Sequence, residues 1–494
     1  MAHCASTALP GTRPIQTIPV EVLLRISYHL PTPDLGALRL TCRSVEQSLY
    51  TTFVSEFFTR KKFMITQDSL QTLIDISKSR LSRHLRDVHI GLDRFPEGST
   101  RPLSDEVKEA KFRQRFADNF TLWNTGHHRD MMAEAFRNLE NLTTIVIRDF
   151  NSRRRSRDGD SAEWHSYGYT TIFNETGVSL NQGMTGVWNS GLPNQYGSQV
   201  FAAVIFALGA ANAKPKGIEI MSRNNNEMRD FAFNIPAYLQ SSVVPILQGL
   251  EKLHLSIDLA WRCCNLGWSA HAPGVTRAAP DLLIRQFLAH TTNLKDLRIN
   301  EHKTNNAGLI DLLDWMVGDG GDSSSQSKST QDAPVISMPH LEKLSLGAMS
   351  VDAPRLLKLV KKFASSLKSL ELWKVTMTRN MPPMARTPAP KEIFWAFFFK
   401  KLIEIPGLDL KHFKAGMLQQ HWVEKPVPIH VSFKGHGPTR EYFGSNCKDF
   451  IGEIKELLEA QWPDDNHHHQ HHHQFLHGDP EFQSKVPSSQ FTSE

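Results

Sequence analysis

The sequence predicts a mixed α/β chain, with a small helical unit at the N-terminus and an irregular solenoid of strand–helix units after it. Two observations lead to this class. Residues 15–60 hold three short runs of apolar residues at helical spacing. Downstream, the pattern apolar-x-x-apolar-x-apolar recurs, and helix-like stretches separate several of its copies. A strand followed by a helix, repeated along a chain, is the building unit of a solenoid.

The N-terminal segment is expected to form three helices joined by tight turns. Pro19 suits a first helical turn, where its missing N–H is not needed. Pro31 ends that helix, and Thr32-Pro33 begins the next one as N-cap and first helical residue. The apolar stripe between them is Leu23, Ile26 and Leu30. A unit of about 40 residues buries too little surface to be stable alone, so it must pack on a partner or on the rest of the chain.

This segment resembles an F-box. The residues that carry the resemblance are Ile18-Pro19, Glu21, Ile26, Leu30, Asp34-Leu35 and Leu40-x-Cys42-Arg43. It departs from the family in two places: Ile18 stands where Leu is usual, and the Trp common after the Cys-Arg pair is absent. The alternative is a plain three-helix hairpin packed on the following domain.

The F-box resemblance implies docking to a Skp-type adaptor and, through it, to a cullin-RING ubiquitin ligase. The residues expected on the adaptor-facing surface are Ile18, Pro19, Leu23, Ile26, Leu30 and Leu35. Some of these six must instead hold the helices together, and the sequence alone does not separate the two groups.

The recurring strand pattern resembles the strand segment of a leucine-rich repeat. Its copies begin at Leu85, Leu142, Leu250, Leu294, Leu341 and Leu367, with a weaker copy at Ile405-Leu408-Leu410 and a partial one at Ile218-x-Ile220. From Leu250 the intervals are 44, 47 and 26 residues, and only the last fits a regular repeat of about 20–29 residues. We therefore expect a degenerate array with long insertions; the alternative is an α/β domain whose strands merely look alike. An F-box followed by such an array is similar to F-box proteins of the fungal type.

The pattern and its interruptions predict five regions. These are a disordered N-terminus (1–14), the F-box (15–60), the repeat-like domain (61–410) with insertions at 151–200 and 318–334, a C-terminal α/β piece or cap (411–462), and a disordered His/Gln-rich tail (463–494). The run Arg153 to Arg157 is open to two interpretations: a nuclear localisation or nucleic-acid contact, or a solvated loop.

Composition excludes several function classes. The chain has 494 residues, 40% hydrophobic and 22% charged, as in ordinary globular proteins. A net charge of +5 over this length gives no reason to expect nucleic acid as a partner. The five cysteines are scattered, which fits a reducing compartment. Residues 1–17 lack the apolar run of a signal peptide. We expect a cytoplasmic or nuclear protein with no membrane partner.

No motif of an enzyme, metal site or cofactor site is recognisable, so a non-catalytic chain without metal or cofactor is expected. The predicted function is a substrate-recognition subunit that binds a target protein through the strand face. The candidate target contacts are Lys252, His254, Lys295, Arg298, Lys343, Ser345, Lys368, Glu371 and Trp373. Several are basic, which suggests an acidic or phosphorylated target, unless they form a solvated face. The alternatives are a scaffold whose F-box does not promote ubiquitination, and a divergent enzyme or nucleic-acid binder.

Overall fold

The computed structural model describes most of the chain. The described residues are 15–96, 104–153, 155–180, 195–259, 282–301, 307–318, 333–381, 391–424 and 427–462. The expected disordered termini, the His-rich tract within the second of them, and most of the 318–334 insertion lie outside these ranges.

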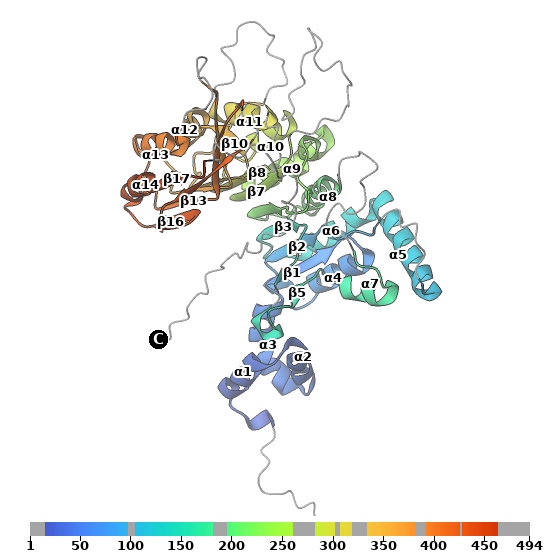
Figure 1. Ribbon diagram of the computed structural model, residues 1–494. Coiled ribbons are helices and arrows are strands. Elements are labelled where there is room, and N and C mark those ends of the chain that lie inside the picture. The colour runs from blue at the N-terminus through green and yellow to red at the C-terminus, as the bar shows by residue number, and fades with distance from the viewer. Residues whose placement is uncertain are drawn as a thin grey trace, which may run out of the picture.

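The array is built on a ten-stranded sheet whose strands follow one another in chain order (Figure 1). Nine of its strands run parallel: β1 (Arg60–Met64), β2 (Asp87–Gly91), β3 (Thr144–Arg148), β6 (Gly217–Met221), β7 (Lys252–Ile257), β8 (Asp296–Glu301), β9 (Lys343–Gly347), β11 (Ser369–Trp373) and β13 (His412–Gly416). The tenth, β16 (Thr439–Phe443), is antiparallel to β13. Sequential neighbours in one parallel sheet are the mark of a solenoid, so the mixed α/β class and the array of strand–helix units are confirmed.

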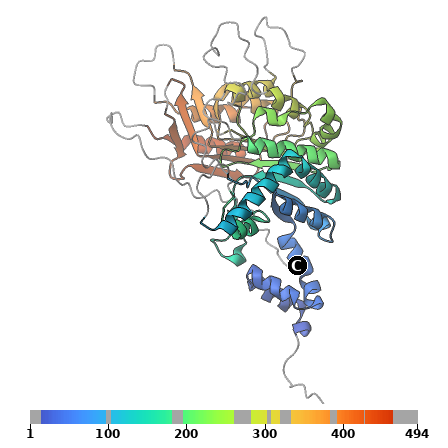
Figure 2. The same cartoon turned by 90° about the vertical axis from the view of Figure 1, so that its right-hand side faces the viewer.

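Helices cover one face of this sheet (Figure 2). They are α4 (Gln67–Ser77), α6 (His127–Asn138), α8 (Tyr196–Ala211), α9 (Ala237–Gly249), α10 (Leu282–Ala289), α11 (Ala307–Val317), α12 (Ala353–Lys362) and α13 (Phe394–Ile403). Alternate strand residues such as Leu344 and Leu346 point toward the helices and are buried in one continuous core. Because side chains alternate along a strand, the residues between them lie on the other side, which we call the open face.

Two strands of the main sheet, β13 and β1, differ from expectation. Pairing in β13 aligns Phe413 with Leu370 of β11, so the last copy is Leu410-Phe413-Ala415, and the expected Ile405-Leu408-Leu410 is out of register. The first strand, β1, was not expected at all. Its position opposite Val88 of β2 holds Lys61, so the apolar spacing is broken there.

A second sheet begins in the last repeats. Its strands are β10 (Ser350–Asp352), β12 (Thr376–Arg379), β14 (Leu418–Trp422), β15 (Ile429–Phe433) and β17 (Leu458–Ala460). The chain turns from the main sheet into this sheet at Ala348, Lys374 and Met417, which have φ of 50°, 53° and 53°. Each of the three corners donates its backbone N–H to a carbonyl of the neighbouring segment: to Trp373, Gly416 and Pro438 at 2.9 Å. The same left-handed corner is therefore repeated three times without glycine.

The C-terminal end of the array closes with antiparallel strands and one helix. β16 covers the edge of β13, and α14 (Cys447–Glu456) packs beside α13. Since β13 is a strand of the main sheet, the array extends past residue 410, and only the part after it forms the end cap. An array end needs such a cap to protect its core and its sheet edge.

The N-terminal helices are α1 (Val20–His29), α2 (Thr32–Leu40) and α3 (Arg43–Phe57), which leads into β1. They project from the end of the array that begins with β1 (Figure 1). The remaining elements are α5 (Glu106–Asn124), α7 (Tyr169–Thr176), the paired strands β4 (Ser152–Arg153) and β5 (Glu163–Trp164), and the short helices η1 (Ile15–Thr17), η2 (Ser82–His84), η3 (Ser156–Asp158) and η4 (Asp230–Phe233).

Candidate functional site

The three N-terminal helices have a small core of their own. Its buried members are Leu23, Leu35, Val45, Leu49 and Phe57. Ile18 and Leu30 are half-buried against it. This core is separate from that of the array, so the unit depends on further contacts for its position.

The structure divides the six residues expected on the adaptor-facing surface. Leu23 and Leu35 are each 3% exposed and hold the helices together, so neither offers a surface to a partner, and the expectation for these two is wrong. Pro19 and Ile26 are exposed, and Ile26 is 43% accessible. Ile18 and Leu30 contribute only part of their surface.

Four exposed apolar residues of this unit were not foreseen. Val20, Val22, Tyr28 and Leu40 are 43%, 47%, 71% and 87% exposed. Val22 lies four residues before Ile26, so the two lie one above the other on α1, beside the stripe of Leu23 and Leu30 that faces the core. The helical spacing of this pair was the available signal. It was missed because Ile26 was assigned to the stripe of Leu23 and Leu30, and Val22 was assigned to no face of the helix.

A hairpin from the 151–200 insertion holds the N-terminal unit in place. Arg157 donates from Nη1 to the carbonyls of Ser27 (2.7 Å) and Leu30 (2.6 Å) at the end of α1. Its other nitrogens bind the carboxylate of Glu56 in α3 at 2.6 and 2.7 Å. Asp158 accepts from the Thr32 backbone N–H (2.9 Å) and hydroxyl (2.7 Å) at the start of α2.

These contacts satisfy the orphan backbone groups at two helix ends. The Leu30 carbonyl at the end of α1 and the first N–H of α2, that of Thr32, have no partner within their helices, and Arg157 and Asp158 supply one to each. The Ser27 carbonyl also accepts from the Leu30 N–H, at 3.3 Å. We call residues 152–164 the clamp hairpin. Within the run Arg153 to Arg157, Arg155 and Arg157 serve in the clamp and are not free for nucleic acid, and Arg154 lies outside the described residues.

The same insertion covers the first strands of the open face. Lys62, His89 and Arg148 lie on that face but are 1%, 6% and 6% exposed. The Lys62 ammonium donates to the Phe150 carbonyl and to Asn151 Oδ1, at 3.2 and 2.8 Å. Burial lowers the pKa of Lys62 to about 8, against the attraction of Asp93. Lys62, His89 and Arg148 are therefore closed to a target, which can use the open face from β6 onward.

Seven of the nine expected target contacts lie in the strands at open-face positions. They are Lys252, His254, Arg298, Lys343, Ser345, Glu371 and Trp373. Lys295 and Lys368 do not belong to this set, because they precede β8 and β11. Lys295 pairs with Glu251 at 3.0 Å and Lys368 with Asp409 at 3.4 Å, at the edge of the sheet.

The open face carries charges of both signs. Pairs cross neighbouring strands at Lys252–Glu219 (2.5 Å), His254–Asp296 (2.9 Å), His412–Glu441 (2.9 Å) and Lys414–Glu441 (3.5 Å), and Arg298 reaches Glu371 at 3.3 Å. Burial acts to raise the pKa of Asp296, but the hydrogen bond from His254 and neighbouring lysines hold it below its usual range. The expected basic face is therefore a mixed face, and an acidic target has no special preference for it.

Comparison with known proteins gives little further information. No family model matches the chain, and no curated protein matches it. Among solved structures, the leucine-rich repeat-containing protein LegL7 from Legionella pneumophila is similar at 11% identity, covering 74% of this chain and 91% of its own, with a TM-score of 0.26.

The described residues also limit the chemistry. No group of three or more His, Cys, Asp or Glu side chains among them is placed to hold a metal ion. In the same part of the chain, none of the helices combines the length and apolar character needed to cross a membrane. The features left to explain are the exposed apolar residues of α1, the clamp hairpin and the open face.

Proposed function

We propose that this chain is the substrate-recognition subunit of a Skp–cullin–F-box type ubiquitin ligase. The N-terminal helices would be the F-box and dock the adaptor, and the open face from β6 to β16 would bind a target protein. The chain itself would perform no chemistry. It would bring a target lysine close to the charged ubiquitin, which raises the effective concentration of the two reactants.

The observation that carries the proposal is the exposed apolar surface of α1. The three-helix unit is small, and it leaves these apolar residues in contact with solvent instead of using them in its own core. Pro19, Val22 and Ile26 are exposed to solvent beside the packed stripe of α1. Contiguous exposed apolar residues indicate a protein partner. The F-box resemblance supplies the kind of partner, a Skp-type adaptor.

The clamp hairpin supports the same function. A ligase subunit must hold its target at a defined place relative to the adaptor, which a freely rotating F-box would not do. Arg157 and Asp158 tie both α1 and α2 to the array by hydrogen bonds. The protein would act in the cytoplasm or nucleus, where such ligases operate.

Reconstitution tests this proposal. The full chain is mixed with a Skp-type adaptor, and the complex is then combined with cullin, RING subunit and ubiquitin-charged enzyme. Ubiquitin transfer to a protein bound at the open face supports the ligase function. Adaptor capture without any transfer supports a scaffold instead, and no capture by the folded chain overturns both.

A further inference from the structure

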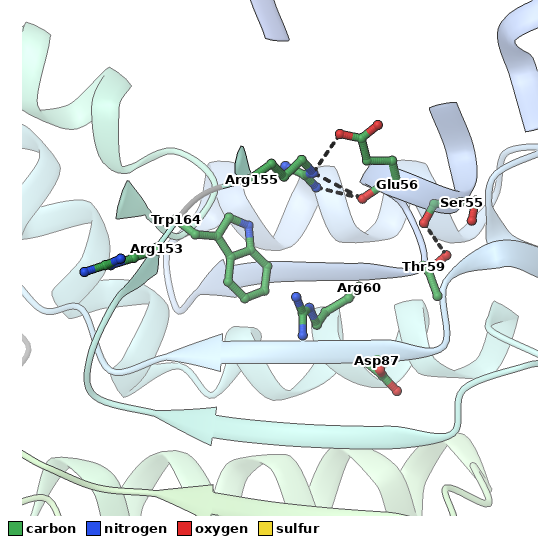
Figure 3. Close-up of a pocket in the computed structure, with 8 residues that line it drawn as sticks. All are labelled: Ser55, Glu56, Thr59, Arg60, Asp87, Arg153, Arg155 and Trp164. Carbon is green, nitrogen blue, oxygen red and sulfur yellow. Dashed lines mark hydrogen bonds and ion pairs between the residues drawn. The ribbon is translucent and has the colours of Figure 1, made fainter. Parts of the chain in front are cut away.

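The two edges of the ten-stranded sheet differ in how the described residues cover them. At the first edge, the Tyr167 N–H donates to the Lys62 carbonyl of β1 at 2.8 Å. Figure 3 shows Trp164 of the clamp hairpin beside Arg60 at the start of the same strand, with the guanidinium carbon 5.2 Å from the ring centroid. The last edge is β16, which pairs with β13 and, within the described ranges, has no second neighbour in the sheet. An unpaired strand edge is a template for another extended chain.

Hydrogen bonds just outside β16 show which of its backbone groups face β13. The Gly444 N–H donates to the Lys411 carbonyl at 2.8 Å, and the Met417 N–H donates to the Pro438 carbonyl at 2.9 Å. In an antiparallel pair, every second residue bonds to the opposite strand through both its N–H and its C=O. The even-numbered residues of β16 therefore face β13, and the odd-numbered residues direct their N–H and C=O to the outside.

Three residues of β16 direct their backbone groups outward: Thr439, Glu441 and Phe443. We call these three residues the β16 edge. Within the described ranges, none of their N–H or C=O groups has a backbone hydrogen bond to a segment outside the main sheet. An extended chain laid along this edge could therefore form a ladder of hydrogen bonds without displacing an existing one.

The side chains leave the β16 edge accessible. Phe443 is 70% exposed and stacks on the His412 ring of β13, with ring centroids 4.1 Å apart. Tyr442 points to the other side of the sheet, where it stacks on Phe450 of α14 with a centroid distance of 5.0 Å. Because side chains alternate along a strand, Phe443 lies on the open face and α14 packs on the opposite face. An added strand would extend the open face and place one of its side chains beside Phe443.

The Glu441 carboxylate, held on the open face by His412 and Lys414, indicates what kind of chain pairs at this edge. A second copy of this protein could use all three positions only in the antiparallel register that places Glu441 opposite its own counterpart. Like charges directly opposite one another destabilise a strand pair. A different chain has no such constraint, and a basic residue opposite Glu441 and an apolar residue beside Phe443 favour its binding. An extended segment of another protein therefore fits the edge better than a second copy.

We propose that the β16 edge binds an extended segment of a protein partner, which adds one strand to the main sheet. The backbone groups of Thr439, Glu441 and Phe443 supply the hydrogen bonds, while Glu441 and Phe443 select a basic and an apolar side chain on the segment. Strand addition of this kind is a general mode of peptide recognition. The assignment of this partner as the ligase target rests on the proposed function, whereas the pairing itself needs no adaptor.

Selection of peptides on the full chain, without adaptor, tests the edge. The probe is a phage-displayed library of random linear peptides, and the enriched peptides are synthesised for fluorescence polarisation. The test variant is Glu441→Pro, which removes an outward N–H and keeps the bonds of its two neighbours to β13, because proline is tolerated at such edge positions. The matched control, Glu441→Ala, loses the same carboxylate but keeps the N–H. Thermal unfolding of both variants shows that the fold is kept.

A second arm of the experiment leaves the protein unchanged and modifies the peptide. N-methylation at alternate residues removes the N–H groups from one edge of an extended peptide, so the two alternate sets of methyl groups block opposite edges. One set should abolish binding to the intact chain, and the other should leave the affinity within about threefold.

We expect the enriched peptides to bind Glu441→Pro at least about tenfold more weakly than Glu441→Ala, the effect of losing one hydrogen bond. The proposal is overturned if no peptide is enriched, if every enriched peptide binds the two variants equally, or if both methylated sets bind alike. A dimer of the full chain in analytical ultracentrifugation that Glu441→Pro dissociates would assign the edge to a second copy and so also overturn it. Because no adaptor is present, these outcomes are separate from those of adaptor docking.

Discussion

The guanidinium of Arg157 binds both carboxylate oxygens of Glu56, with Nε to Oε1 at 2.6 Å and Nη2 to Oε2 at 2.7 Å. The two residues are 101 positions apart in the chain. Arg157 is 8% exposed, so the pair is shielded from water on the arginine side. This pair joins the last N-terminal helix to a hairpin that leaves the array after its third strand.

Arg157→Ala should loosen the N-terminal helices. It leaves Glu56 without its main partner and removes the donor to two carbonyls of α1, so we expect a loss of about 2–3 kcal/mol in the local stability of this unit. Amide hydrogen exchange of residues 20–57 measures it, with the array as internal reference. Arg153→Ala, at a side chain without a described partner, should cost less than about 0.5 kcal/mol. Equal protection in both variants would contradict the clamp.

Asp158→Ala should weaken the start of α2. The Asp158 carboxylate accepts from the Thr32 N–H and hydroxyl and so takes the place of a local N-cap. Loss of a helix cap costs about 1 kcal/mol. Asp158→Asn keeps one acceptor oxygen and should lose less. Faster exchange in α2 for Ala than for Asn, with α14 unchanged, is the expected result; the same exchange in both would show that Thr32 is capped by water.

The sequence predicts the three N-terminal helices but not the contacts that hold them against the array. The helical spacing around Leu23 and the proline at 31 were enough to place the three helices, because these signals act between near neighbours. The clamp could not be predicted, since Arg157 and Asp158 meet Ser27, Leu30 and Thr32 more than 120 residues away. Nothing local distinguishes an arginine that binds helix carbonyls from one that faces water.

The corner at Lys374 gives a stability test for the array. A residue at φ of 53° is strained unless it is glycine or, to a lesser degree, asparagine. Lys374→Val adds a β-branched side chain to that conformation and should lower the free energy of unfolding by about 1–2 kcal/mol. Lys374→Gly should be neutral or stabilising, because the relief of strain offsets the added chain entropy. Urea unfolding of both variants is the measurement; a more stable Val variant would exclude a left-handed corner.

These corners also show why the second sheet could not be predicted from the sequence. Glycine and asparagine are the residues that predict a left-handed turn, whereas the chain uses Ala348, Lys374 and Met417 there. The leucine pattern predicted β2, β3, β6, β7, β8, β9 and β11 correctly, because their apolar residues are buried in a regular order, but it missed β1 and gave β13 out of register. The strands of the second sheet that follow the corners, such as β10 and β12, are short and lack that order.

Glu301 predicts a pH dependence of stability. Burial, and then the charge of Asp258, raises the pKa of this carboxyl from 4.5 to about 8. Between these values the unfolded chain has lost the proton that the folded chain keeps, so stability falls as the pH rises through this window. Glu301→Gln should therefore raise the free energy of unfolding at pH 7.5, by an amount on the order of a few kcal/mol. The gain should vanish below about pH 4.5.

Thermal unfolding at several pH values checks this prediction. The matched control is Glu371→Gln on the open face, where the carboxylate pairs with Arg298. That change should give no gain at pH 7.5, because it removes a partner instead of a buried charge. A gain for Glu301→Gln that is the same at pH 4 and pH 7.5 would show that the effect is not ionisation.

The most direct test of adaptor docking is a titration of the full chain with a purified Skp-type adaptor. The test variant is Val22→Asp/Ile26→Asp, which places charge on the exposed face of α1 and leaves Leu23 and the small core intact. The control is Val107→Asp/Phe120→Asp on α5, where both residues are also exposed, at 79% and 62%. We expect binding by the intact chain and the control, and at least about a hundredfold loss for the test variant, since central interface residues each contribute about 2 kcal/mol or more. No binding by the intact, folded chain, or equal binding by both variants, would contradict it.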